Sequence, residues 1–185
     1  MLSPELDVPT AYWFYKNYLL DATRNKAEVY EQYGFLSPSV PFIDWEVFAA
    51  ILFRDRAKSG YGADLERHEV KSAAMGSSFE YQYHKFRGLD KLEEDQRIDH
   101  VFISYANGYQ DLDVYYMRAA KIATIFQGWK LELVENYQAG RQRFRKSIPF
   151  GYVRREGWLI LAIRNGELTH PAQPGGSIYV SPPMQ

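Results

Sequence analysis

The chain has 185 residues, of which 46% are hydrophobic and 24% are charged, and it contains no cysteine. This composition excludes an intrinsically disordered chain, and the missing cysteine excludes a disulfide scaffold, a thiol nucleophile and cysteine-ligated zinc. The formal net charge of -1 lacks the basic excess that is usual in proteins that bind nucleic acid. We therefore expect one folded domain, residues 1–185, with a chemistry of carboxylates, hydroxyls and four histidines.

The first part of the chain has helical periodicity. Apolar residues recur every three or four positions over 9–23 and predict a helix, and a second, shorter helix is expected over 26–33. Gly34 is a typical helix terminator. An amphipathic helix is predicted over about 42–57, with Glu46 in its first turns.

The period then changes to two, and strands alternate with one helix to the end of the chain. Alternating or apolar runs predict strands over 69–72, 79–84, 101–105 and 113–117, a helix over 122–133, a terminal hairpin over 152–163 and a tail over 171–185. This order predicts an α/β or α+β domain with a mixed sheet.

No segment approaches the roughly 20 consecutive apolar residues of a membrane-spanning helix. The first residues also lack the basic and apolar regions of a signal peptide. We expect no membrane partner and a cytoplasmic location.

The segment 62–72 carries the most informative polar residues. In a strand, Glu69 and Lys71 share one face while Val70 points to the opposite, packed face. Asp64 has the opposite parity, so it joins Glu69 only if the chain turns or bulges between them. Two such carboxylates and the Val70 carbonyl would offer Mg²⁺ the oxygen ligands that it prefers.

A magnesium ion held in this way polarises a phosphoryl oxygen and activates a water molecule, and Lys71 would orient that water or offset the developing charge. This set of residues predicts phosphodiester hydrolysis. The alternative is an ordinary surface strand that bears an ion pair, because Glu-x-Lys arises by chance in many chains.

The segment resembles the PD-(D/E)xK nuclease superfamily, in the branch that contains the PvuII restriction endonuclease and the MutH nicking endonuclease. The resemblance spans about residues 42–165, and its matching residues are Gly62, Asp64, Glu69, Lys71 and Ser72, after a helix with Glu46 and before Gly76-Ser77-Ser78. It implies a restriction-endonuclease-like mixed sheet flanked by helices, with a nuclease core over 42–165. Residues 1–40 form an N-terminal helical segment, for which we expect a role in dimerisation.

The resemblance also implies a role for each matching residue. Asp64 and Glu69, with the Val70 carbonyl, would ligate Mg²⁺, Lys71 would act on the attacking water, and Glu46 would join the site. Only four residues separate Asp64 from Glu69, fewer than the family usually has, so Glu66 is an alternative first ligand.

Two further segments indicate contact with DNA. On the strand 79–84 the residues that can read base edges share one face, and the PvuII branch places base-reading residues here. Arginines at alternate positions in 141–145 would form a phosphate clamp; the alternatives are a solvated strand face and a solvated edge. The expected DNA-binding residues are Ser72, Ser77, Ser78, Glu80, Gln82, His84, Lys85, Arg141, Arg143 and Arg145.

Together these features predict a Mg²⁺-dependent, sequence-specific endonuclease of the type II restriction class, acting on double-stranded DNA as a homodimer in a bacterium or archaeon. A methylation-dependent enzyme, a MutH-like nicking enzyme and a non-catalytic DNA-binding module are the alternatives. The acidic stretch 90–99 is expected to face away from DNA. His68 is expected to be a strand residue near the site rather than a metal ligand.

Overall fold

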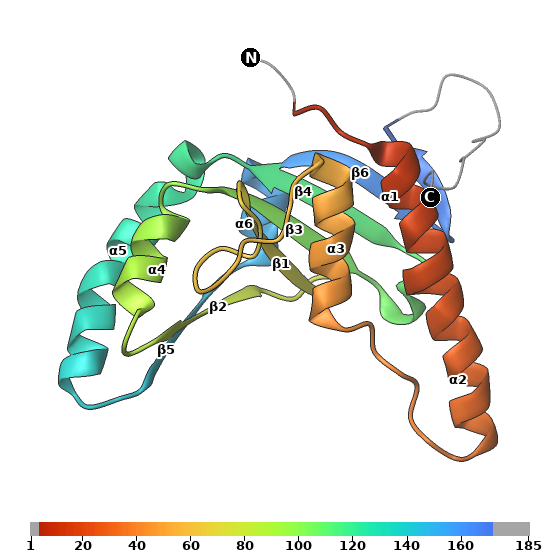
Figure 1. Cartoon of the computed structure of the whole chain (residues 1–185), viewed down its shortest axis with the longest axis horizontal. Helices are drawn as coiled ribbons and strands as arrows, with labels where there is room; N and C mark the ends of the chain where they lie inside the picture. Colours follow the sequence, from red (N-terminus) through yellow and green to blue (C-terminus); the bar gives the residue numbers. More distant parts are fainter. Residues whose placement is uncertain (1–3, 172–185) are drawn as a thin grey trace.

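A five-stranded mixed sheet lies at the centre of the computed structural model, which describes residues 4–171 (Figure 1). In spatial order its strands are β1 (His68–Ala74), β3 (Asp99–Tyr105), β4 (Leu112–Met117), β6 (Trp158–Arg164) and β7 (Glu167–His170). β1 runs parallel to β3, and the other neighbours are antiparallel. The expected mixed sheet is therefore confirmed, and β1 forms one of its two edges.

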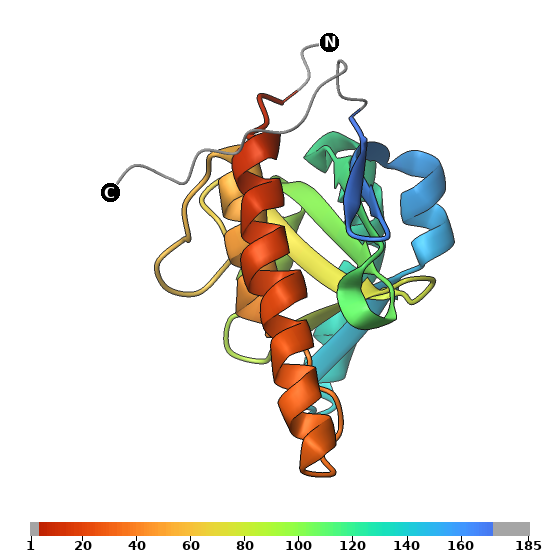
Figure 2. The ribbon, with the colours of Figure 1, turned by 90° about the vertical axis from the view of Figure 1, so that its right-hand side faces the viewer.

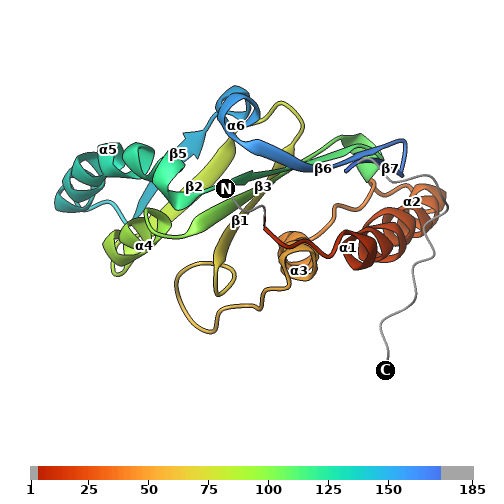
Figure 3. The ribbon, with the colours of Figure 1, turned by 90° about the horizontal axis from the view of Figure 1, so that it is seen from above.

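Helices cover both faces of this sheet (Figure 3). One face packs against α1 (Val8–Phe14), the π-helical η1 (Tyr15–Asp21) and α3 (Phe42–Phe53). The second core contains α4 (Gly88–Asp95), α5 (Ala119–Gln138), α6 (Phe150–Glu156) and a two-stranded ribbon of β2 (Phe79–His84) and β5 (Arg143–Ile148). The 3₁₀ turn η2 (Asn107–Tyr109) joins β3 to β4. The strand β2 thus belongs to a separate ribbon beside the main sheet.

The N-terminal helices form one continuous helix rather than the two that the sequence predicts. It begins at Val8 after the Asp7 cap, continues through η1 into α2 (Ala22–Gln32), and keeps helical dihedral angles at Asp21 and Ala22. No glycine or proline interrupts it after its first turn, so nothing in this segment ends a helix. None of the α2 residues is buried, and α2 extends past the sheet (Figure 2).

The third helix ends four residues earlier than predicted. Arg54 adopts a left-handed conformation with φ of 49° and follows directly after the last helical residue, Phe53. The segment 54–67 is consequently a long loop that leads into β1, and this loop carries Asp64.

The predicted hairpin over 152–163 is wrong. Pro149 caps α6, Phe150 and Val153 pack one turn apart into the core, and the helix ends where the Gly157 amide donates to the Val153 carbonyl. β6 then pairs with β7 around a turn at 165–166. The segment 150–156 is therefore a helix, because Phe150 and Val153 lie at helical spacing and both pack into the core, although its β-branched and aromatic residues favour a strand.

Within residues 4–171, no helix has the length and apolar character required to cross a lipid bilayer. Apart from Pro171, the predicted tail lies outside the described residues.

Candidate active site

A cleft of about 460 Å³ opens at the free edge of β1, between this strand and the β2 side of the ribbon. The helices α3 and α4 flank β1 on either side (Figures 1 and 3). Ten of the predicted site residues line the cleft: Glu46, Asp64, Glu69, Val70, Lys71, Ser72, Ser78, Glu80, Gln82 and His84. Ser77, Lys85 and the three arginines of 141–145 do not line it.

A tight turn before β1 brings Asp64 to the site. The Leu65 amide donates to the His68 carbonyl over 3.0 Å, so the chain turns between Leu65 and His68 as the parity argument requires. The Asp64 Oδ2 atom accepts from the Val70 amide at 3.0 Å and lies 3.7 Å from the Lys71 ammonium. Because the amide and carbonyl of one residue in an extended strand point to the same side, the Val70 carbonyl faces this edge too.

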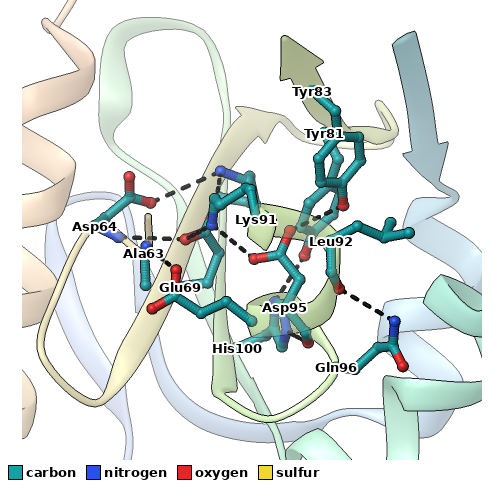
Figure 4. Close-up of polar contacts among 12 residues, drawn as sticks. Ala63, Asp64, Glu69, Tyr81, Tyr83, Lys91, Leu92, Asp95, Gln96 and His100 are labelled. Carbon is teal, nitrogen blue, oxygen red and sulfur yellow. Dashed lines mark hydrogen bonds and ion pairs between the residues drawn. The ribbon is translucent and has the colours of Figure 1, made fainter. Parts of the chain in front are cut away.

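Glu69 is the buried centre of the site, with a side chain that is 1% exposed. Its Oε1 atom lies 2.5 Å from the Lys71 ammonium. Its Oε2 atom lies 2.6 Å from the ammonium of Lys91 (Figure 4). Burial alone would raise the pKa of Glu69, but the two ammonium groups outweigh burial and lower it to about 2. Glu69 is therefore ionised at neutral pH.

The carboxylates of Glu69 and Asp64 also keep Lys71 positively charged. Burial acts to lower its pKa, but Glu69 and Asp64 hold the pKa well above the ordinary value. Lys71 is consequently a cation that donates hydrogen bonds, and its ammonium lies 5.1 Å from the centre of the Tyr81 ring.

The sequence prediction missed two residues of the site, Lys91 and Asp95, which lie one turn apart on α4. Lys91 donates to both Glu69 and Asp95 at 2.6 Å, and the buried Asp95 also accepts from the Tyr83 hydroxyl at 2.8 Å. Asp95 belongs to the acidic stretch 90–99, which was expected to face away from DNA, and it is instead buried and lines the cleft. The only local signal was the i, i+4 spacing of an acid and a base, which surface helices also show.

A buried histidine completes this network. His100 Nε2 lies 2.8 Å from the Asp95 carbonyl, which can only accept, so this nitrogen carries the proton. The other ring nitrogen, Nδ1, lies 2.9 Å from the Tyr81 hydroxyl. Burial lowers the pKa of His100 to about 4, so the ring is neutral in the folded protein.

This neutral ring predicts a pH-dependent stability. An unfolded histidine takes a proton below about pH 6.5, whereas His100 resists protonation until about pH 4. The His100 contribution is therefore complete above pH 6.5 and lost as the pH falls to 4, on the order of 3 kcal/mol. Burial raises the pKa of Asp95 to about 6. This shift makes the folded protein more stable as the pH falls, which is the opposite of the His100 effect.

The difference between wild type and His100→Gln isolates the His100 contribution. Urea unfolding at pH 7, 5.5 and 4.5 is expected to show the wild-type advantage shrinking as the pH falls. An advantage that is constant across this range would contradict a neutral buried His100.

The charges around the cleft fit one divalent cation. Five carboxylates line it, and one of them, Glu80, pairs with Arg145. The other four, Glu46, Asp64, Glu69 and Asp95, face the two ammonium groups of Lys71 and Lys91, so two negative charges remain unbalanced. Burial raises the pKa of Glu46 and of Asp64, and the neighbouring carboxylates raise both further. A cation of charge +2 would relieve this repulsion.

The acidic side chains are not yet arranged as ligands. Among residues 4–171, no three acidic or histidine side chains converge in a metal-binding group. Glu69 is not free to act as a metal ligand in this arrangement, because each of its two carboxylate oxygens already has a lysine ammonium as its partner. Glu66, the alternative ligand, is exposed and lines a neighbouring hollow with Lys58 and Glu94 instead of the cleft.

The β2–β5 ribbon has one aromatic and one polar face, as the alternation predicts. Phe79, Tyr81 and Tyr83 are buried. On the opposite face Gln82 pairs with Arg145 and His84 with Arg143, so glutamine, histidine and arginines share one surface. Glu80 lies on the same face, 3.9 Å from the Arg145 guanidinium.

The other predicted residues lie around this ribbon. Arg141 precedes β5, and all three arginines border a separate hollow beside α5. Lys85 follows β2, and Ser77 lies in the exposed turn between β1 and β2. His68 is a residue of β1, as expected, and its Nδ1 lies 2.7 Å from the Asp55 carboxylate.

No family model matches the chain, and no curated protein has a matching sequence.

Proposed function

We propose that the protein is a Mg²⁺-dependent endonuclease that cuts double-stranded DNA at specific sequences, in the manner of a type II restriction enzyme. One observation carries the proposal. The Asp64 and Glu69 carboxylates and the Lys71 ammonium meet at the free edge of β1, in a cleft whose lining continues onto the polar face of β2. A phosphate group in this cleft would lie next to both the proposed metal ligands and the Lys71 ammonium.

Asp64, Glu69 and the Val70 carbonyl would hold Mg²⁺, with Glu46 beside them. The bound ion would supply neutralisation of the phosphoryl charge and a water molecule of lowered pKa. Because its raised pKa keeps Lys71 protonated, Lys71 would orient the attacking water and offset charge as a hydrogen-bond donor, and would not remove a proton.

The ribbon would enter the major groove, with Glu80, Gln82 and His84 toward base edges and the arginines toward phosphates. Double replacement Arg143→Ala/Arg145→Ala is expected to weaken binding to all DNA sequences alike, because phosphate contacts carry no sequence information. The slope of log affinity against log salt should fall in magnitude by about 2, since each phosphate contact contributes about 0.9.

Fluorescence anisotropy with a labelled duplex at 50 to 200 mM salt measures this slope. Arg154→Ala is the matched control, because Arg154 lies exposed on α6, outside the ribbon. Equal slopes for the double variant and wild type would contradict the phosphate role.

The proposed enzyme is a homodimer, so that two sites cut the two strands. Only the first part of the N-terminal helix packs into the core. Its last turns, the connector that follows and the start of α3 present exposed apolar side chains: Val29, Tyr30, Tyr33, Phe35, Leu36, Phe42 and Ile43. Sedimentation equilibrium is expected to give twice the chain mass, and Tyr33→Ser/Leu36→Ser to shift it toward the monomer. A wild-type monomer at tens of micromolar would contradict the dimer.

A second candidate is a non-catalytic DNA-binding module. The pairing of both Glu69 oxygens with lysines favours it, since those oxygens are then not free to ligate a metal ion.

Digestion of plasmid DNA separates the two candidates. The nuclease proposal predicts cleavage with Mg²⁺ and none with excess EDTA. The same digestion is repeated with unmethylated, hemimethylated and fully methylated plasmids. The plasmid that is cut separates a restriction enzyme from a methylation-dependent enzyme, and the number of strands cut separates either of them from a nicking enzyme. Binding without cleavage of any substrate would favour the non-catalytic module and overturn the nuclease proposal.

A further inference from the structure

Lys91 is shared between a proposed metal ligand and a carboxylate outside the ligand set. Its ammonium lies 2.6 Å from Glu69 Oε2 and 2.6 Å from Asp95 Oδ1, and its side chain is 11% exposed (Figure 4). Lys91 and Asp95 are one helical turn apart on α4, so their pairing does not depend on β1.

Asp95 is held firmly on its own. It is fully buried, and its Oδ2 atom accepts from the Tyr83 hydroxyl at 2.8 Å. Lys91 would thus keep a fixed anionic partner after losing Glu69. Within residues 4–171, both ion-pair partners of Lys71 are proposed metal ligands, because its second carboxylate is that of Asp64.

A divalent cation at Glu69 Oε2 would come close to the ammonium of Lys91. Two positive charges at such separations in a poorly hydrated site repel each other strongly. The cation and Lys91 therefore compete for the same oxygen, and Lys91 can yield because Asp95 remains as its partner.

We propose that Lys91 is a positioning residue that occupies Glu69 until a divalent cation displaces it, after which Asp95 alone retains Lys91. This inference rests on the proposed function. In the absence of the cation Lys91 keeps the buried Glu69 ionised and oriented toward the cleft. The attraction of Asp95 for Lys91 determines how readily Lys91 leaves Glu69 when a cation binds.

Two substitutions are expected to change metal affinity in opposite directions. Lys91→Met removes the competitor and should tighten Mn²⁺ binding about tenfold, whereas Asp95→Asn leaves Lys91 with Glu69 alone and should weaken it about tenfold. Electron paramagnetic resonance of free Mn²⁺ measures the binding without any activity assay. A merely structural role would weaken binding in both variants, and that result would overturn the inference.

Control variants separate contact from general charge and from misfolding. Lys58→Met removes a lysine that pairs with Glu94 near the Asp64 loop but does not touch Glu69, so binding should change less than about threefold because solvent screens it. The double variant Lys91→Met/Asp95→Asn removes the pair without a net change of charge. It should fold, judged by circular dichroism, and bind Mn²⁺ at least as tightly as wild type.

The two proposals fail in distinguishable ways. If wild type and Glu69→Gln bind Mn²⁺ equally, Glu69 is not a ligand, and both the metal site and the role of Lys91 are overturned. If Glu69→Gln loses binding but Lys91→Met binds no more tightly than wild type, or if Lys58→Met tightens binding as much as Lys91→Met, only the Lys91 inference is overturned.

Discussion

Replacing Lys71 with methionine is expected to lower the rate of Mg²⁺-dependent DNA cleavage by about 10²- to 10³-fold, the usual cost of removing one preorganised hydrogen-bond donor that stabilises developing charge. Methionine keeps most of the length of the side chain and removes only the ammonium, which lies 2.5 Å from Glu69. The fold should persist, because Lys91 still neutralises Glu69. Single-turnover cleavage and anisotropy with the same duplex should show a lost rate and a retained affinity.

Lys130→Met is the matched control for this substitution. Lys130 is an exposed lysine of α5 that pairs with Glu93 outside the cleft, so its loss should leave the rate unchanged. A Lys71→Met rate within threefold of wild type would contradict a role for Lys71 in the reaction. Loss of DNA binding in this variant would show that the ammonium holds the substrate instead.

Replacing Glu69 with glutamine is expected to affect both stability and metal binding. The neutral amide leaves the ammonium groups of Lys71 and Lys91 without their central carboxylate in a buried site, and removal of one partner of a buried pair costs about 3–5 kcal/mol. Urea unfolding should show this loss, and the Mn²⁺ titration should show loss of binding in the fraction that remains folded.

The same loss should appear in wild type as the pH falls. The pKa of Glu69 is lowered to about 2 in the folded protein, so its contribution is complete above the ordinary value of 4.5 and disappears as the pH falls toward 2. Glu69→Gln should lack this part of the acid transition. An unchanged transition would indicate that Glu69 is not the ionised centre of the site.

Glu66→Gln is the control, because Glu66 is an exposed glutamate of the same loop. Its unfolding free energy should stay within about 0.5 kcal/mol of wild type. The pair Asp64→Ala and Glu66→Ala then tests the first ligand. Cleavage that survives Asp64→Ala but not Glu66→Ala would contradict the assignment of Asp64.

The fold was predictable where the local pattern was long or strictly periodic. The alternation of 79–84 predicts β2 with its observed bounds, and the apolar spacing of 122–133 predicts the centre of α5. The short helix α6 was missed, because seven residues hold too few repeats to separate helix from strand. The merging of the N-terminal helices was missed because polar residues between two apolar stripes do not by themselves end a helix.

The candidate site divides in the same way. Asp64, Glu69 and Lys71 lie within eight positions of one another. Strand parity put Glu69 and Lys71 on one face, and Asp64 could join them only through a turn, which the structure contains. The sequence by itself thus determined a mixed α/β chain with a cluster of acidic and basic residues at the start of one strand and a polar face on the next. These features depend on spacing between near neighbours.

Only the tertiary structure decided which groups neutralise the charge of this cluster. Lys91 and Asp95 reach Glu69 because α4 lies between β2 and β3 in the chain and packs beside β1 and β2 in space. No periodicity in the sequence encodes that approach, since it depends on long-range packing of Leu92, Tyr83 and α5 in the second core. The same packing buries Glu69, and because burial alone would raise the pKa of this carboxyl, the ammonium groups of Lys71 and Lys91 are what keep it ionised.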